Sequence, residues 1–367
     1  MSLTSIRTLA FRNLLDAETS IRGNDIFLVG ENGQGKSNFL EALYFCCYAS
    51  SFRGVRDSDL ANNGKNDFSA EIKITGSADS ENNILSDNIL VKAEKGKKTV
   101  LINGKRTEDR KDLLYSAPCI VFCHEDMEFV SGSHEKRRWF FDQVLSLYDA
   151  VYLDDLRRFR HVLKSRNSVL RDYAHGNLAG DHESILDALD AQFVLYGSRL
   201  MEKRKIAAEL FSGIFGPLYR DVSGLDGITV KYVPSWKDTD DVAQIIAERR
   251  SADLSAGISL CGPHRDRYVF NCQGDEFAGK ASTGQRRLLA LLLRVAQARR
   301  FSEMTGKKPI LLLDDVLLEM DGEKRQKFFS VMPDYDQGFY TFLPEEPYHN
   351  YRKDDSLVYH VNGGIVS

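Results

Sequence analysis

Residues 26–45 read IFLVGENGQGKSNFLEALYF, and the expected fold of the whole chain follows from them. An apolar run, Ile26–Val29, stops at Gly30, and residues 30–37 fit the pattern G-x-x-x-x-G-K-[ST]. Apolar residues at helical spacing follow from Phe39 onward. The stretch therefore predicts a buried strand, a tight glycine loop and a helix, which is the context that this phosphate-binding motif requires.

The predicted loop has the chemistry of a nucleotide site. Its glycines allow the backbone to turn N–H groups toward a phosphate chain, at the positive end of the helix dipole. We expect Lys36 to reach the β- and γ-phosphates, and the Ser37 hydroxyl to complete the shell of a Mg²⁺ ion. The residues predicted to bind ATP are Gly30, Glu31, Asn32, Gly33, Gln34, Gly35, Lys36, Ser37 and Asn38.

A second stretch, residues 309–315, reads PILLLDD and is expected to complete this site. Its large aliphatic residues predict a buried strand that ends at two carboxylates. We expect Asp314 to hold Mg²⁺ together with Ser37, and Asp315 to be the general base that polarises the attacking water. Acids at the end of a buried strand are common. Combined with the glycine loop, they indicate an ATPase whose catalytic residues are Asp315, Asp314 and Lys36.

Four residues open another predicted helix shortly before the second stretch: Ser282, Thr283, Gly284 and Gln285. A helix N-terminus favours an anion, and a plain helix cap at Ser282 or Thr283 is compatible with the same residues. Since the glycine loop already holds the phosphates of its own nucleotide, we expect this helix to serve a γ-phosphate presented by another subunit. The order resembles the LSGGQ signature of ABC-type ATPases, and it implies an ATP-dependent homodimer. Asp321 follows at the distance of a D-loop residue that bridges the two sites.

The fold class expected from these motifs is α/β. It consists of an ABC-type P-loop ATPase head, with a mixed sheet and helices, and an inserted helical arm domain. Residues 131–252 are highly charged with apolar residues at helical spacing, which predicts the arm. From residue 253 onward strand and turn patterns return, so the chain is expected to rejoin the sheet of the head. The head would then be residues 1–130 and 253–367, with an antiparallel meander over residues 68–102.

Two basic stretches are candidates for contacts with DNA. Lys105 and Arg106 follow the hairpin signal Asn103-Gly104, and the first long helix of the arm carries a row of cationic residues. Lysines also protect exposed sheet edges, and charge runs are often only solvated faces, so both interpretations stay open. The members of the helical row are Arg157, Arg158, Arg160, Lys164, Arg166 and Arg171.

Length, charge and cysteine usage set further limits. The 367 residues suffice for two domains, and a net charge of -4 excludes a global basic field, so DNA would be bound by local patches or by a dimer. The six cysteines are scattered, the N-terminal apolar stretch is short, and no run reaches membrane-spanning length. These features predict a cytoplasmic protein with no membrane partner.

Taken together, these motifs resemble those of the RecF family, bacterial recombination mediator ATPases related to SMC and Rad50 heads. The resemblance covers nearly the whole chain. It implies an ABC-type head with a short arm, ATP-dependent dimerisation on double-stranded DNA, and slow, DNA-stimulated ATP hydrolysis. It also implies action with RecO and RecR, which place RecA on gapped DNA coated with SSB. The residues that carry it are Phe11-Arg12-Asn13, residues 30–38, Ser51-Phe52-Arg53, Glu125-Asp126 leading to Arg137-Arg138, and residues 262–266, 282–285 and 313–321.

The chain departs from the family pattern in two places. No glutamine marks a Q-loop near His124, and the run of small hydroxyl residues after the last sheet strand is reduced to Thr341, with no switch histidine beside it. The alternatives are another SMC-like or Rad50-like ABC ATPase, or an ATP-binding DNA scaffold with little turnover. An ABC transporter subunit would lack so long a helical insertion and would carry a glutamate after the second motif.

Overall fold

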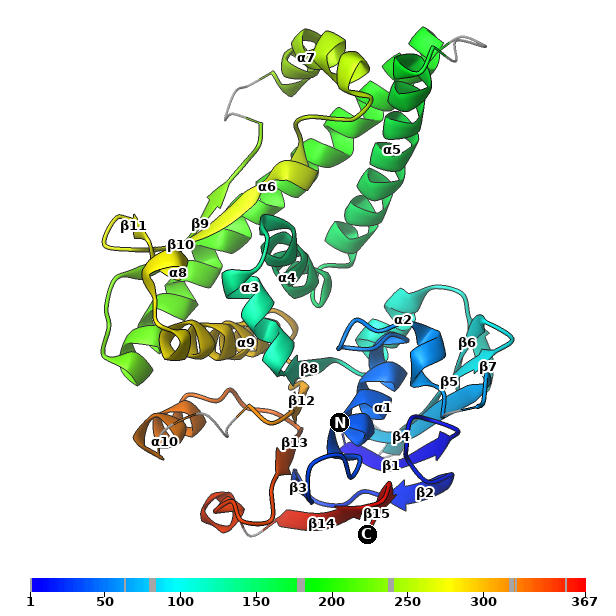
Figure 1. Cartoon of the computed structure of the whole chain (residues 1–367), viewed down its shortest axis with the longest axis vertical. Helices are drawn as coiled ribbons and strands as arrows, with labels where there is room; N and C mark the ends of the chain where they lie inside the picture. The colour runs from blue at the N-terminus through cyan, green and yellow to red at the C-terminus, as the bar shows by residue number, and fades with distance from the viewer. Residues whose placement is uncertain are drawn as a thin grey trace. The chain divides into compact units, whose positions relative to one another are not determined.

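The computed structural model describes residues 2–367 except 63, 79–83, 177–181, 237–240, 317–319, 321 and 354. By internal packing the chain divides into two compact units (Figure 1), one of Met1–Asp126 with Phe301–Ser367 and one of Met127–Arg300. Residues 253–300, which the sequence assigned to the head, thus belong to the second unit by this division. None of the helices within the described ranges is long and apolar enough to cross a membrane.

The first unit is built on a sheet with the order β15-β14-β3-β13-β12-β8. Its pairs are parallel except β14 with β15, and the central β3 (Asp25–Val29) is buried throughout. Parallel pairing brings the carboxyl ends of β3 and β12 to one edge, so the loops that follow them meet there. The other strands are β8 (Cys119–Phe122), β12 (Ile310–Leu313), β13 (Gln337–Phe342), β14 (Ser356–Asn362) and β15 (Ile365–Val366).

The strand, loop and helix predicted over residues 26–45 are confirmed. Helix α1 (Lys36–Tyr48) follows β3 after the glycine loop, and its N-cap is Gly35, with a φ of 120° and no side-chain hydrogen bond. The first N–H groups of a helix have no partner within the helix. Because Gly35 has no side chain that could cap them, these N–H groups can serve an anion.

A second sheet of the first unit has the order β2-β1-β4-β5-β6-β7. Its strands pair antiparallel, so the meander predicted over residues 68–102 is confirmed, as is the hairpin turn at Asn103-Gly104 between β6 and β7. Apolar side chains of this sheet and of α1 share one core. The bounds are β1 (Ser2–Leu9), β2 (Ala17–Ser20), β4 (Phe68–Ala78), β5 (Ile84–Glu94), β6 (Lys97–Ile102) and β7 (Lys105–Thr107), followed by α2 (Arg110–Ser116).

The second unit is mainly helical, with α5 and α6 antiparallel and side by side (Figure 1). The expectation that the chain rejoins the head sheet after residue 253 is wrong. Instead β10 pairs antiparallel with β9, in a separate sheet of order β11-β10-β9. Buried and exposed side chains alternate along both strands, so pairing joins their buried sides into one apolar face of this sheet. The bounds are α3 (Glu128–Ser131), α4 (His134–Ser146), α5 (Ala150–Ala174), α6 (His182–Ser223), β9 (Ile228–Val233), α7 (Val242–Ala256), β10 (Arg267–Cys272), β11 (Asp275–Glu276), α8 (Phe277–Lys280) and α9 (Thr283–Thr305). In the first unit, α10 (Gly322–Ser330) follows β12.

A buried ion network ties α4, α6 and the segment before β10 together. Arg204 is 3% exposed and donates to Asp142 at 2.7 Å, to Asp266 at 2.9 Å and to the carbonyl oxygen of Pro263 at 2.7 Å. A buried guanidinium needs such partners, because an unpaired charge is costly away from water. The string Gly-Pro-His-Arg-Asp that ends at Asp266 is therefore a packing element of the second unit.

Candidate nucleotide-binding site

The glycine loop surrounds the amine of Lys36. Lys36 is 4% exposed, and its Nζ donates to the carbonyl oxygens of Gly30 at 2.6 Å and Glu31 at 3.1 Å. Gly33 and Gly35 have φ values of 78° and 120°, a backbone region that favours glycine. The loop is thus folded around a cationic centre that a phosphate chain would approach.

A cavity of about 210 Å³ lies at the loop. It is lined by six of the nine residues predicted to bind ATP, together with Asp315 from the segment after β12 and Arg53. Of the other three, Gly30 and Glu31 accept from Lys36, and Gln34 is bound to residues 363 and 364. The loop and the second carboxylate of the 309–315 stretch therefore meet in one cavity. The lining residues are Asn32, Gly33, Gly35, Lys36, Ser37, Asn38, Arg53 and Asp315.

Asp314 has the properties of a metal ligand. Its Oδ1 is buried without a hydrogen-bond partner among the described residues, and burial raises the pKa of its carboxyl to about 6. The neighbouring Ser37 side chain and Arg53 lower this pKa in part, while Asp315 and Glu125 raise it. A hard cation with oxygen ligands would supply the missing partner. Ser37 and Asp314 therefore fit Mg²⁺ by their donor chemistry.

Thr341 in β13 fixes the conformation of Asp315. The backbone of Asp315 has a φ of 51°, which is uncommon for a residue with a side chain. The Thr341 hydroxyl accepts from the N–H of Asp315 at 2.8 Å and donates to its Oδ1, also at 2.8 Å. Thr341 is buried, at 3% exposure. One hydroxyl therefore holds both the backbone and the carboxylate of the predicted general base.

Replacing Thr341 with valine, which keeps the volume and removes the hydroxyl, tests this contact. We expect the ATPase turnover number to fall about tenfold, the equivalent of one lost hydrogen bond to a charged group. The KM for ATP should change little, because Thr341 acts through Asp315. Thr341→Ser is the matched control and should restore most of the turnover. Equal turnover in wild type and Thr341→Val would contradict the positioning role.

Glu41 is an acid inside the apolar face of α1. Its side chain is fully buried and accepts from Arg12 Nε at 2.9 Å and Nη2 at 3.3 Å, and from the Ser51 hydroxyl. These contacts join two of the short strings that carry the family resemblance, those at residues 11–13 and 51–53. The sequence showed both strings but not their common partner, although a glutamate among apolar helix residues was a signal for it.

Arg53 connects this network to the cavity. It donates to Asn38 Oδ1 at 3.1 Å, and its Nη2 lies 3.7 Å from Asp314 Oδ2. It also lies 3.8 Å from Glu41. A guanidinium that lines the cavity beside the glycine loop has the geometry to contact a phosphate oxygen. Sequence reasoning named Arg53 only as part of a family string and gave it no role.

The predicted signature residues form a capped helix N-terminus in the second unit. The N–H of Ser282 donates to Gln285 Oε1 at 2.8 Å, and the N–H of Gln285 donates to Ser282 Oγ at 3.2 Å. This reciprocal pair is a capping box, and Ser282, Thr283, Gly284 and Gln285 are all exposed. The helix cap expected at Ser282 is confirmed, whereas the contact with another subunit's nucleotide stays a prediction. Asp321 lies outside the described residues.

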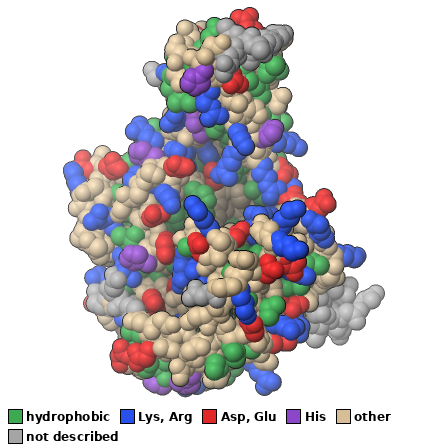
Figure 2. All heavy atoms as spheres, turned by 45° about the vertical axis from the view of Figure 1, so that its right-hand side comes forward, with side chains coloured by type: hydrophobic (Ala, Val, Ile, Leu, Met, Phe, Trp, Pro, Cys, Tyr) green, Lys and Arg blue, Asp and Glu red, His purple; other side chains and the backbone are tan. Residues whose placement is uncertain are grey.

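The candidate DNA contacts are exposed in both units. Arg157, Arg158 and Arg160 lie on α5, and Lys105 and Arg106 lie on β7. Figure 2, turned so that the α5 side of Figure 1 comes forward, shows Lys and Arg side chains on this face with acidic ones among them. The exposure fits a contact surface, and it fits a solvated surface equally well.

Arg166, one of the residues of the predicted cationic row on α5, does not face solvent. Arg166 is fully buried and pairs with Asp190 at 2.6 Å and with Asp253 at 2.7 Å. The helical period turns Arg166 away from solvent, toward α6 and α7, which carry these two acids. The expectation that Arg166 faces DNA with the rest of the row is therefore wrong.

Comparisons with known sequences agree on one family. The model of the RecF/RecN/SMC N terminal domain matches residues 2–354. The DNA replication and repair protein RecF of Treponema pallidum is 38% identical over 358 residues, which cover 96% of this chain and 97% of that protein. The protein of the same name from Oenococcus oeni is 30% identical over 380 residues, which cover 100% and 99%.

Two solved structures share the fold. One, described as the recombination mediator protein RecF-ATP in the RecFOR pathway, has a TM-score of 0.87 and 25% identity, over 100% of this chain and 96% of that chain. The other is a Smc head domain derived from Pyrococcus furiosus and bound to the C-terminal domain of ScpA. It has a TM-score of 0.54 and 16% identity, over 100% and 95%, so it shows the fold alone.

Proposed function

The chain belongs to the RecF family, and from this premise we propose that it is an ATP-dependent DNA-binding protein of recombinational repair and replication-fork maintenance. The observation that carries the proposal is the single cavity in which the glycine loop, Arg53 and Asp315 meet. The solved relative that is described as RecF-ATP supports ATP as the ligand. The proposed enzyme activity is weak ATP hydrolysis that DNA stimulates.

Each side chain has a proposed task in this reaction. Lys36 and the open N–H groups of α1 bind the phosphate chain, while Ser37 and Asp314 hold Mg²⁺, which neutralises charge on the phosphates when it is bound. Asp315 accepts a proton from the attacking water, and Thr341 keeps its carboxylate in place. Arg53, which lines the same cavity, orients the phosphates.

The proposed active state is an ATP-dependent homodimer. In it, the segment Ser282–Gln285 of one copy contacts the γ-phosphate bound by the other, and Asp321 bridges the two sites. The dimer would bind double-stranded and gapped DNA, with Arg157, Arg158 and Arg160 or the β7 pair as contacts. RecR, together with RecO, is the proposed direct partner, RecA and SSB are indirect ones, and the compartment is the cytoplasm. The solved relative's RecFOR pathway supports these partners.

Sedimentation velocity tests the proposal. With ATP and Mg²⁺ at low salt, we expect the monomer to become a dimer that co-sediments with a duplex containing a single-strand gap. DNA binding should weaken as salt rises, because phosphate contacts release counterions. A chain that stays monomeric with ATP and ignores the gapped duplex would contradict it.

Ser282→Arg tests the contact between subunits. We expect this variant to keep its ATP affinity but to lose ATP-driven dimerisation, because the long cation occupies the surface that must meet the partner's nucleotide. Ser255→Arg, at an exposed serine of α7, is the matched control and should dimerise like wild type. Dimerisation of Ser282→Arg at the wild-type ATP concentration would exclude this surface from the interface.

A further inference from the structure

The glycine loop is hydrogen-bonded to the turn that joins β14 to β15. The N–H of Gly363 donates to Gln34 Oε1 at 2.7 Å, and the N–H of Gly364 donates to the backbone oxygen of Gln34 at 2.9 Å. The carbonyl oxygen of Gly364 accepts from the N–H of Leu15 at 3.0 Å. A two-residue turn thus contacts the middle of the loop and the segment after β1.

The contact leaves no free space at Gly364. A Cβ added there would lie 1.9 Å from the carbonyl oxygen of Asn13, and one added at Gly30 would lie 2.3 Å from that of Val361. Asn13 in turn donates through Nδ2 to the carbonyl oxygen of Gly33 at 3.1 Å. The turn, Asn13 and the loop therefore form one chain of close contacts.

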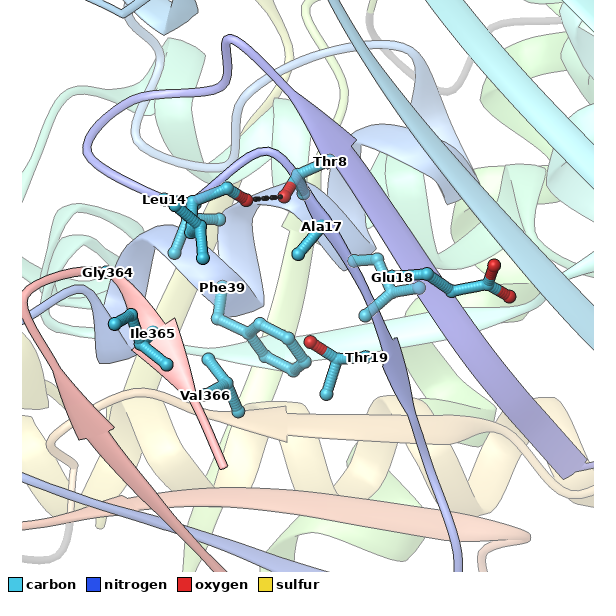
Figure 3. A pocket seen from close by; sticks show the side chains of 11 residues that line it. Thr8, Leu14, Ala17, Glu18, Thr19, Phe39, Gly364, Ile365 and Val366 are labelled. Atoms are coloured by element: carbon cyan, nitrogen blue, oxygen red, sulfur yellow. Dashed lines mark hydrogen bonds between the residues drawn. The ribbon is translucent and has the colours of Figure 1, made fainter.

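Apolar packing continues from the turn to the phosphate-binding helix. Figure 3 shows Ile365 and Val366 of β15 beside Phe39, which belongs to the first turn of α1, with Leu14 above Phe39 in this view. These residues line a small cavity of about 70 Å³. The segment after β14 thus contacts the loop by hydrogen bonds, and its Val366 packs against the core cluster that includes Phe39 of α1.

We propose that residues 361–366 are a positioning brace, which holds the glycine loop in its phosphate-binding conformation. A loop with several glycines has many accessible conformations, so fixing it beforehand lowers the entropic cost of binding phosphate. ATP affinity then depends on a turn that lies 329 residues from the loop in sequence. If the ordered turn raises the affinity for ATP, thermodynamic linkage requires that bound ATP stabilises the ordered turn by the same free energy. The inference rests on the proposed nucleotide site.

Two neighbouring glycines provide a matched test. Gly363 and Gly364 both have positive φ values, 56° and 83°, but a Cβ at Gly363 would meet no atom of the described residues within 4 Å. Alanine therefore strains the backbone at both positions and displaces Asn13 only at Gly364. We expect Gly364→Ala to weaken ATP binding at least about tenfold, and Gly363→Ala to weaken it less than about threefold. Isothermal titration with Mg²⁺-ATP gives the affinities, and urea unfolding shows whether each variant is folded.

Hydrogen exchange of the wild-type chain is a second test that needs no variant. We expect saturating Mg²⁺-ATP to slow exchange of the Gly363 and Gly364 amides at least about tenfold, and to leave the Gly104 amide in the β6–β7 turn unchanged. Equal ATP affinity in the two alanine variants, or exchange at the turn that ignores ATP, would overturn the brace. A wild-type chain that binds no ATP would instead overturn the proposed function.

Discussion

Lys36→Ala is expected to abolish measurable ATP binding while the chain stays folded. In the structure the amine of Lys36 is held by two loop carbonyl oxygens, at 2.6 Å and 3.1 Å, so it is already aimed into the loop. A phosphate chain would gain charge-assisted hydrogen bonds from it, and their loss should weaken ATP binding at least about 100-fold. Titration calorimetry with Mg²⁺-ATP measures this change.

A second lysine of the same unit provides the control. Lys98 donates to the carbonyl oxygen of Ala49 at 2.6 Å and to Asp57 at 2.9 Å, so it caps the other end of α1. Lys98→Ala removes similar hydrogen bonds to backbone oxygen and should lower the free energy of unfolding by about 1 kcal/mol. Its ATP affinity should match wild type. Unchanged ATP affinity in Lys36→Ala would refute the assignment of the site.

Local patterns predicted the parts of this site, and long-range contacts assembled them. The strand, loop and helix over residues 26–45 were predictable because their signals are contiguous in sequence. The hydrogen bonds of Thr341 to Asp315 and of Gly363 to Gln34 were not predictable, since these partners are 26 and 329 residues apart in sequence. Strand β9 was missed because its six residues lie within a long helical pattern.

The partners of buried polar residues could not be predicted from the sequence either. The sequence placed Arg166 in a cationic row, since charge alone does not show which face of a helix packs against acids. Arg53 belongs to a string that the family resemblance had singled out and Glu41 does not, yet the fold brings the two side chains within 3.8 Å of each other. Residue types were thus predictable at the site, while the partners that orient them were set by tertiary packing.

Asp314→Asn is expected to have opposite effects on activity and stability. The substitution weakens the Mg²⁺ ligand that Asp314 is proposed to provide, so ATP hydrolysis should fall at least about 100-fold. In the chain without nucleotide, however, the Oδ1 atom of Asp314 is buried and has no hydrogen-bond partner among the described residues. A neutral amide removes the cost of burying that charge. The variant should therefore be inactive and more stable.

The pH dependence gives the sign of the stability effect. Burial raises the pKa of Asp314 from its ordinary 3.8 to about 6 in the folded chain. Between these two pKa values the folded state binds more protons than the unfolded state. The free energy of unfolding therefore falls as pH rises through this window, and the full destabilisation by Asp314 is present above pH 6. A shift of this size corresponds to an upper limit of roughly 3 kcal/mol.

Urea unfolding without nucleotide, at about pH 7.5 and about pH 4, tests this relation between stability and function. We expect Asp314→Asn to unfold at a higher urea concentration than wild type at the higher pH, and the difference to shrink at the lower pH, where the wild-type carboxyl is protonated in the folded state. Asp334→Asn, at an exposed acid 3.4 Å from Lys308, should show little difference at either pH. If Asp314→Asn were less stable than wild type at pH 7.5, the charged carboxylate would stabilise the folded chain. Its burial would then carry no cost in stability that Mg²⁺ binding could relieve.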